Sequence, residues 1–216
     1  MKLKGCVTQR LLKNNFKPKT KTKMKTMIKS LAFSLLFGAG LLTSCENNAN
    51  HDKDESSKDV AEQQNEDKFN NKADEKDAQF VVDVVAANYD EIKFANYGLS
   101  KSMNDEIKKL AKDMITDHTK AVNSLKEIAA AKMISVPGWD STKIDKKMEN
   151  WNDKKPADFD RDWTNEMIDM HKNTVDKLED RQKNTTDPEL RGWIDNTLPT
   201  VRSHLDMLNQ CKEKLK

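Results

Sequence analysis

Apolar residues recur at helical spacing through most of the chain from Asp77 onward. They alternate in steps of three and four, which places them on one face of an α-helix. This pattern predicts four long helices, over about residues 78–101, 103–133, 158–184 and 188–215. The chain has only 6 glycines and few β-branched runs, which argues against a sheet-based fold. The predicted fold class is therefore all-α.

Polar residues at the predicted helix starts match the residues preferred at N-caps. Ser102, which is followed by Asp105 and Glu106, is expected to cap the helix over 103–133. Asp187 and Pro188 provide a cap and a proline at the first helical position of the last helix.

The connections between the predicted helices indicate how they pair. The first two helices, and likewise the last two, are joined by a few residues and should form antiparallel hairpins. Residues 134–157 form one long connection, in which a short helix is expected near 141–151. A long connection between two hairpins predicts a four-helix bundle of the ferritin type. An up-down-up-down bundle with an elaborated loop is the alternative.

The first 44 residues are typical of an export signal. They contain ten basic residues and no acidic one, and residues 31–42 are an apolar stretch too short to span a bilayer. The following Leu42-Thr43-Ser44-Cys45 resembles the lipobox of bacterial lipoproteins, in which the cysteine is lipidated and becomes the first residue of the mature chain. An ordinary signal peptide with a chance cysteine is the alternative.

Signal peptides usually begin close to their apolar segment, so Met24 or Met27 is the expected start, and residues 1–23 are then an extension. Cleavage before Cys45 predicts a lipoprotein of the bacterial cell envelope, anchored by palmitate-type acyl chains. The outer membrane is the expected location, on its periplasmic or surface face.

Removal of residues 1–44 changes the charge of the protein. The whole chain has 38 basic and 36 acidic residues, a net charge of +2, whereas the remainder keeps 28 basic and all 36 acidic residues, a net charge of −8. An acidic protein is poorly suited to bind nucleic acid. Cys6 is removed with the signal and Cys45 is acylated, so Cys211 is the one free thiol and no intramolecular disulfide is expected.

Residues 46–76 are almost wholly polar. Such a segment cannot bury enough apolar surface to offset the entropy lost on ordering, so residues 45–76 are predicted to be a lipidated cysteine followed by a flexible tether. Residues 77–216 are predicted to be the helical domain, and their four apolar faces provide an ample core.

Three histidines lie on the apolar faces of the predicted helices, each near mid-helix: His118, His171 and His204. Glu91 lies near the inward face of the first helix. At about 1.5 Å per residue, residues paired within each hairpin differ in depth by only about one turn, so all four can converge. Asp117, next to His118, is expected to accept a hydrogen bond from a histidine of this cluster.

Three imidazoles and a carboxylate suit zinc, copper or iron, and helical bundles often bind metals between facing helices. The paired Glu-x-x-His motif of di-iron proteins is missing, since Ile115, Ile168 and Val201 stand three residues before the histidines. The alternative is a buried polar network in which histidine and glutamate fix the register of the helices. On sequence alone the network is the favoured interpretation.

Five short motifs resemble one bacterial family: Ala78-Gln79-Phe80, Glu91-Ile92, Asp117-His118, Phe159-Asp160 followed by His171, and Leu198-Pro199 followed by His204. Together, over about residues 77–212, they look like the family known as domain of unknown function 4142. That family is described as predicted outer-membrane proteins and is grouped with ferritin-like folds. The resemblance implies a ferritin-like four-helix bundle in the envelope, and it implies no reaction.

Two functions fit these observations. The first is a lipid-anchored, non-enzymatic envelope protein with an interaction or stress-related role, whose expected partner is the membrane. The second is a ferritin-like protein that binds a transition metal through Glu91, His118, His171 and His204. The sequence names no protein partner and leaves open whether copies of the chain associate.

Overall fold

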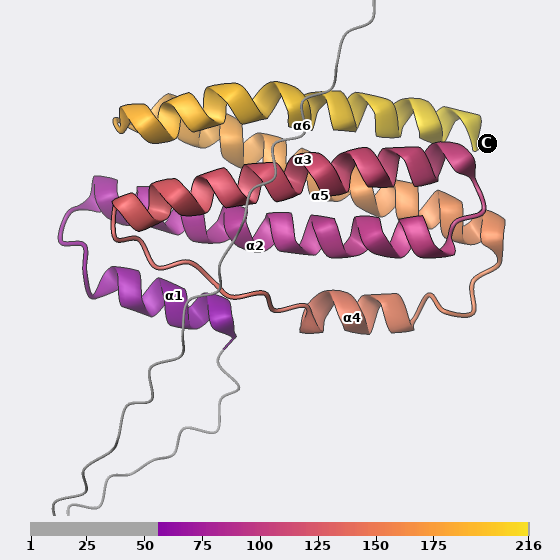
Figure 1. Ribbon diagram of the computed structural model, residues 1–216, viewed down its shortest axis with the longest axis horizontal. Coiled ribbons are helices and arrows are strands. Elements are labelled where there is room, and N and C mark those ends of the chain that lie inside the picture. The colour runs from indigo at the N-terminus through magenta and orange to yellow at the C-terminus, as the bar shows by residue number, and fades with distance from the viewer. Residues whose placement is uncertain (1–55, 216) are drawn as a thin grey trace, which may run out of the picture. The chain divides into compact units, whose positions relative to one another are not determined.

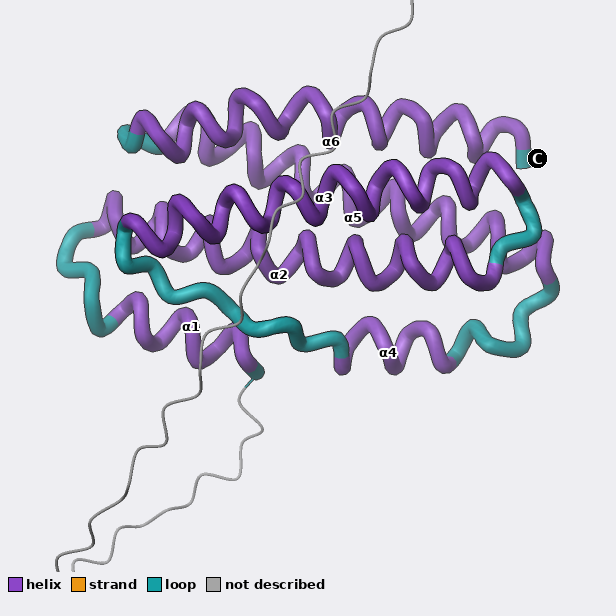
Figure 2. Tube along the Cα trace, viewed as in Figure 1, coloured by secondary structure: helices purple, strands orange, loops and turns teal. Residues whose placement is uncertain are grey.

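Every regular element that the structure describes is a helix. The computed structural model describes residues 56–215, and within them it contains six α-helices and no strand (Figures 1 and 2). They are α1 (Ser57–Glu66), α2 (Lys72–Lys101), α3 (Asp105–Ala131), α4 (Thr142–Glu149), α5 (Pro156–Asn184) and α6 (Pro188–Lys214). The all-α prediction is confirmed. The expected signal segment and Cys45 lie outside the described residues.

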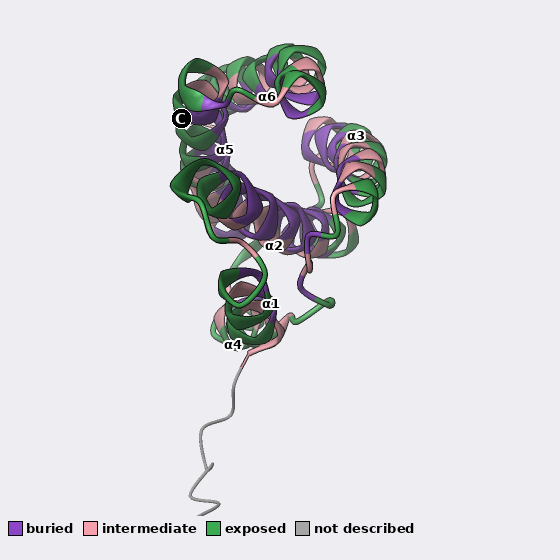
Figure 3. Cartoon of the chain, turned by 90° about the vertical axis from the view of Figure 1, so that its left-hand side faces the viewer, coloured by how far each residue is buried: buried purple, intermediate pink, exposed green. Residues whose placement is uncertain are grey.

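The four long helices α2, α3, α5 and α6 pack side by side around a common core. Helix α2 packs against α3 and α5, and α6 packs against the same two helices. Figure 3 looks along the helices and shows their buried faces turned towards the centre, with α1 and α4 outside this ring on the α2 side. Among residues 56–215, no helix combines the length and the apolar character needed to cross a membrane.

Both predicted hairpins are present, and one of the two predicted caps is wrong. Asp187 caps α6 as predicted, because its side chain accepts hydrogen bonds from two backbone N–H groups of the first turn. Helix α3, however, begins at Asp105 with Asn104 as its N-cap. Asn104 caps at least as well as serine and lies closer to the first buried residue, Ile107. The predicted cap, Ser102, instead ends α2.

Part of the predicted tether over residues 46–76 is folded. Residues 57–66 form α1, and α2 begins at Lys72 rather than near residue 78. Asn65 is buried and exchanges two hydrogen bonds with the backbone of Ser135: its Nδ2 donates to the carbonyl (2.8 Å) and its Oδ1 accepts from the N–H (2.7 Å). The composition argument missed this helix because it counts apolar area and overlooks polar side chains that pair with a distant backbone.

The long connection between α3 and α5 carries α4, as predicted. The side chain of Ile144 is buried and faces the rest of the domain. The hydroxyl of Tyr97 on α2 donates to the carbonyl of Met148 (3.0 Å), and Lys93 pairs with Asp145 (2.9 Å). These contacts fasten α4 to the outer side of α2.

The core consists of two apolar clusters with a polar layer between them. The first cluster includes Val85, Leu125, Leu178 and Ile194. The second cluster includes Phe94, Met114, Met167 and Leu208. On α3, α5 and α6 a buried histidine lies between the residues of the first cluster and those of the second. The polar layer therefore crosses the bundle near the middle of its helices.

Helix α5 packs closely against α2 at Gly98. The indole of Trp163 is fully buried there, and its Nε1 donates to the carbonyl of Phe94, one turn before Gly98 (2.9 Å). A Cβ atom at Gly98 would lie 2.7 Å from Cζ2 of Trp163, which is closer than carbon atoms pack. Glycine is therefore required here by the close approach of the two helices.

Substitution Gly98→Ala should lower the free energy of unfolding by about 1–3 kcal/mol, because the indole must shift out of a packed position. Gly192→Ala is the matched control, since a Cβ at Gly192 in α6 meets no atom of the described residues within 4 Å. The control should be unchanged or stabilised by up to about 1 kcal/mol through helix propensity. Urea unfolding followed by circular dichroism measures both, and equal effects would contradict the contact.

Candidate metal centre

The three histidines singled out by the sequence meet in the polar layer. His118 comes from α3, His171 from α5 and His204 from α6, and none is more than 2% exposed. Their ring centroids are 5.2, 5.3 and 5.6 Å apart. One potential ligand nitrogen from each lies within 4.8 Å of the other two, so the three imidazoles can hold one metal ion.

The tautomer of His171 follows from its own helix. Its Nδ1 lies 2.9 Å from the carbonyl oxygen of Met167, one turn earlier on α5. Because a carbonyl can only accept, Nδ1 carries the proton and Nε2 presents a lone pair. That lone pair faces the centre of the cluster, where Nε2 of His118 lies 3.3 Å away.

The tautomer of His118 is set by Asn88 on α2. The amide nitrogen of Asn88 donates to the carbonyl of Val84 (2.8 Å), which leaves its Oδ1 facing His118. Nδ1 of His118 lies 2.9 Å from that oxygen and donates to it. The Nε2 of His118 is therefore also a lone pair.

Two lone pairs that face each other at 3.3 Å repel unless a positive charge lies between them. A proton on either ring would provide that charge, and so would a metal ion. The separation suits either, because nitrogens bound to a tetrahedral zinc at about 2.0–2.1 Å are themselves about 3.3 Å apart and an N–H···N hydrogen bond spans a similar distance.

The two nitrogens of His204 are in different surroundings. Its Nε2 lies 3.0 Å from Oδ2 of Asp117, whose side chain is 43% exposed. Its Nδ1 is buried and finds no hydrogen-bond partner among residues 56–215. A buried nitrogen without a partner is unfavourable, and a bound cation would satisfy it. Asp117 thus supports His204 on the facing helix, and not its own neighbour His118, because successive residues of a helix point in different directions.

Glu91 lies behind His118, on the side away from His171. Its Oε1 accepts from the hydroxyl of Thr174 (2.8 Å), and its Oε2 lies 3.1 Å from Nδ1 of His118. Within the described part of the chain, the group of mutually close ligand atoms comprises the three histidines without Glu91. In this position a carboxylate orients a ligand histidine and makes it a stronger donor.

Burial favours the uncharged form of two of the imidazoles, His118 and His204. Desolvation lowers the pKa of His118 from 6.5 to about 4, assisted by His171 and His204 and opposed by Glu91. The pKa of His204 is also lowered, by burial and by His171, against the opposing effect of Asp117. A proton shared inside the cluster is therefore disfavoured, and the neutral form that a metal requires is favoured.

Asn88 and Thr174 were not among the site residues expected from the sequence. Asn88 lies three residues before Glu91 and Thr174 three residues after His171, so each shares a helix face with an expected site residue. That spacing was the available signal. It places the residues in the polar layer, and it does not reveal which histidine nitrogen or carboxylate oxygen they bind.

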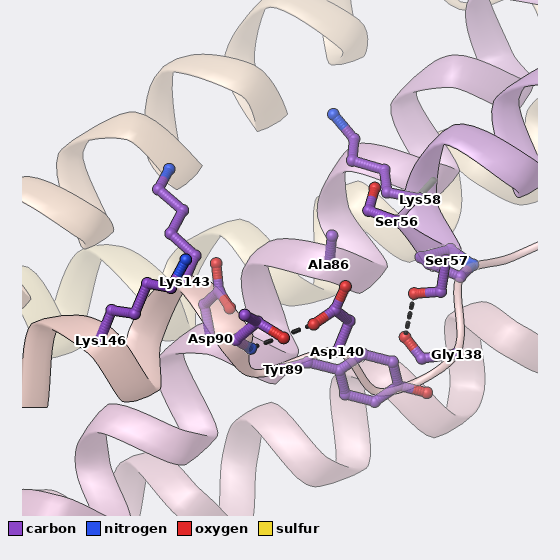
Figure 4. A pocket seen from close by; sticks show the side chains of 12 residues that line it. Ser56, Ser57, Lys58, Ala86, Tyr89, Asp90, Gly138, Asp140, Lys143 and Lys146 are labelled. Atoms are coloured by element: carbon purple, nitrogen blue, oxygen red, sulfur yellow. Dashed lines mark hydrogen bonds between the residues drawn. The ribbon is translucent and has the colours of Figure 1, made fainter. Parts of the chain in front are cut away.

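Away from the histidines, a pocket lies between α1, α2 and the start of α4 (Figure 4). It has a volume of about 760 Å³, and Ser57 at its edge donates to the carbonyl of Gly138 (3.1 Å). Burial raises the pKa of Asp90 to about 6, although Lys143 opposes this shift. The described lining contains lysines and carboxylates of mixed charge and neither histidine nor cysteine, so it offers a weaker set of metal ligands than the three histidines.

The stability of the metal-free protein should fall as the pH is lowered from about 6.5 towards 4. Over this interval the unfolded chain gains a proton on His118 that the folded chain does not bind, so folding is opposed. For His118 alone the loss is at most about 3 kcal/mol. The variant His118→Gln should show a flatter dependence when the free energy of unfolding is measured by urea titration at several pH values. Parallel curves for the two proteins would refute this.

Comparison with known proteins gives one match. The model of a family described as a domain of unknown function (DUF4142) matches residues 59–211. The matched range includes the three histidines together with Asn88 and Glu91. It begins inside α1, so this helix is part of the family's domain. No curated protein and no solved structure matches the chain.

Proposed function

The chain belongs to the DUF4142 family, whose description states no activity, and from its geometry we propose that it binds one transition-metal ion through His118, His171 and His204. One observation carries the proposal. Each imidazole has one nitrogen on a fixed acceptor, and each of the three buried rings offers a ligand nitrogen within 4.8 Å of the other two. Ligand histidines in metalloproteins are held in the same way.

The donor set narrows the class of metal. Three imidazole nitrogens suit zinc, copper and iron, whereas calcium and magnesium prefer oxygen ligands. Three neutral imidazoles are a ligand set that zinc commonly takes, so we propose zinc as the preferred metal, with copper and iron as competitors.

The competing interpretation is a purely structural hydrogen-bond network. It would require a proton between His118 and His171, and burial opposes protonation of His118. It would also leave the buried Nδ1 of His204 without a partner within the described residues. The geometry thus reverses the preference that the sequence alone gave.

We also propose that the four long helices form a ferritin-like four-helix bundle. Two antiparallel hairpins linked by a long connection support this assignment, as does the mid-bundle position of the polar layer. A mononuclear site of three histidines would differ from the paired glutamate and histidine ligands of di-iron bundles.

Protein prepared without a histidine tag, stripped with a chelator and reloaded, should bind about one equivalent of zinc, copper or iron. His118→Ala and His204→Ala should each reduce this to below about a tenth of an equivalent, since two imidazoles hold the ion far more weakly than three. Elemental analysis after gel filtration gives the stoichiometry.

Leu125→Ala is the matched control for this experiment. Leu125 is fully buried on α3, two turns beyond His118, so its truncation also opens the core but removes no donor atom. The control should retain about one equivalent of metal. Wild-type protein that retains no metal after reloading would overturn the proposal and leave the structural network.

For the N-terminal region we propose that Cys45 anchors the chain to the bacterial cell envelope, in the outer membrane. The resemblance of residues 42–45 to a lipobox, after a basic and apolar leader, supports this. A non-enzymatic interaction or stress-related role would fit the same location, and the tethered domain would carry the metal site there.

When the chain is expressed in a bacterium, it should incorporate labelled palmitate and sediment with the membranes. Cys45→Ser should abolish both properties, because the acyl chains have no attachment point. Cys211→Ser is the control, since Cys211 is buried in the second apolar cluster and should not affect anchoring. A Cys45→Ser protein that still carries the label would refute the assignment.

A further inference from the structure

A pocket between α3 and α6 connects the histidine cluster with the surface. Its volume is about 290 Å³, and it reaches both His118 and His204. His171, on α5, does not line it. The cluster is therefore accessible from one side, and the access lies between the two helices that contribute His118 and His204.

The donor set leaves a coordination position open. Among residues 56–215, the mutually close ligand group consists of three histidines and excludes Glu91, whose Oε1 accepts from Thr174 and whose Oε2 lies 3.1 Å from Nδ1 of His118. Structural zinc sites have four protein ligands, whereas sites that react with small molecules have three and keep the fourth position for an external donor. The histidine cluster has three protein ligands and therefore resembles the sites that react with small molecules.

The walls of the pocket indicate what it can accept. One wall is the indole of Trp193, which is fixed by a hydrogen bond from its Nε1 to Oγ of Ser124 (3.0 Å). The lining also includes Thr197 and Thr200, and one residue of each charge, Lys120 and Asp117. Its volume is at the lower end of the range for small-molecule sites, so a polymer chain would not fit.

We infer that the metal centre is an open one, which takes a small anion with a nitrogen or oxygen donor atom through the pocket between α3 and α6. This inference rests on the proposed metal site and adds to it the class of ligand and the route. Lys120 and the carboxylate of Asp117 both line the pocket and offset each other, so the attraction for the anion would come from the metal ion itself, while threonine hydroxyls can donate hydrogen bonds to the anion along the pocket.

Cobalt(II) and azide provide a direct test. The chelator-treated protein is loaded with one equivalent of cobalt(II), which absorbs visible light according to its coordination, and is titrated with azide. Azide should change the visible spectrum in a saturable way. Thr197→Phe, which fills the pocket from α6, should weaken azide binding at least about tenfold while cobalt remains at one equivalent.

Gln210→Phe adds the same side chain to an exposed position of α6 outside the pocket and should bind azide like the wild type. If Thr197→Phe loses its helical circular dichroism, Ala121→Leu fills the same pocket from α3. Failure to bind cobalt would overturn the proposed metal site itself. Cobalt binding without any response to azide, or a response that neither pocket variant weakens, would overturn the open centre or its route.

Discussion

The site depends on three hydrogen bonds made by the outward-facing nitrogens of the histidines. Asn88 accepts from His118, the carbonyl of Met167 accepts from His171, and Asp117 accepts from His204. Each acceptor fixes one tautomer, and together they turn three lone pairs towards one point. Without them each buried ring could rotate or change tautomer, and the cluster would have no defined preference for a cation over a proton.

The polar layer interrupts an otherwise apolar core. Phe94, Met114 and Leu208 lie in the cluster on one side of it, and Val85 and Leu125 in the cluster on the other. Apolar residues of similar volume in the layer would often stabilise such a core, because buried polar groups must be desolvated. A complete set of partners around the outward nitrogens, combined with an unsatisfied inward side, is what a site for a cation requires. The same layer would be poorly constructed as a means of holding four helices together.

The helices were predictable because burial repeats along the chain with the period of a helix. The same rise per residue predicted that His118, His171 and His204 share one depth, and the structure brings them together. What the sequence could not give is rotation about each helix axis, which decides that Asp117 supports His204 and that Glu91 stands behind His118. The cap at Asn104 and helix α1 were missed for different reasons. The cap of α3 is local and could have been placed, because Asn104 accepts from the N–H groups of Glu106 and Ile107, whereas the hydrogen bonds of α1 depend on a distant backbone that composition does not record.

Helix α1 has ten residues, too few to be stable as an isolated helix in water. Its anchors lie 70 to 81 residues further along the chain, where Asn65 pairs with Ser135 and Ser57 with Gly138. Helix α1 also packs on α2, where Lys58 pairs with Asp83 (2.6 Å) and Gln79 donates to Glu62 (2.6 Å). The order of α1 therefore derives from tertiary contacts with two separate parts of the chain, and its own helical propensity would not maintain it.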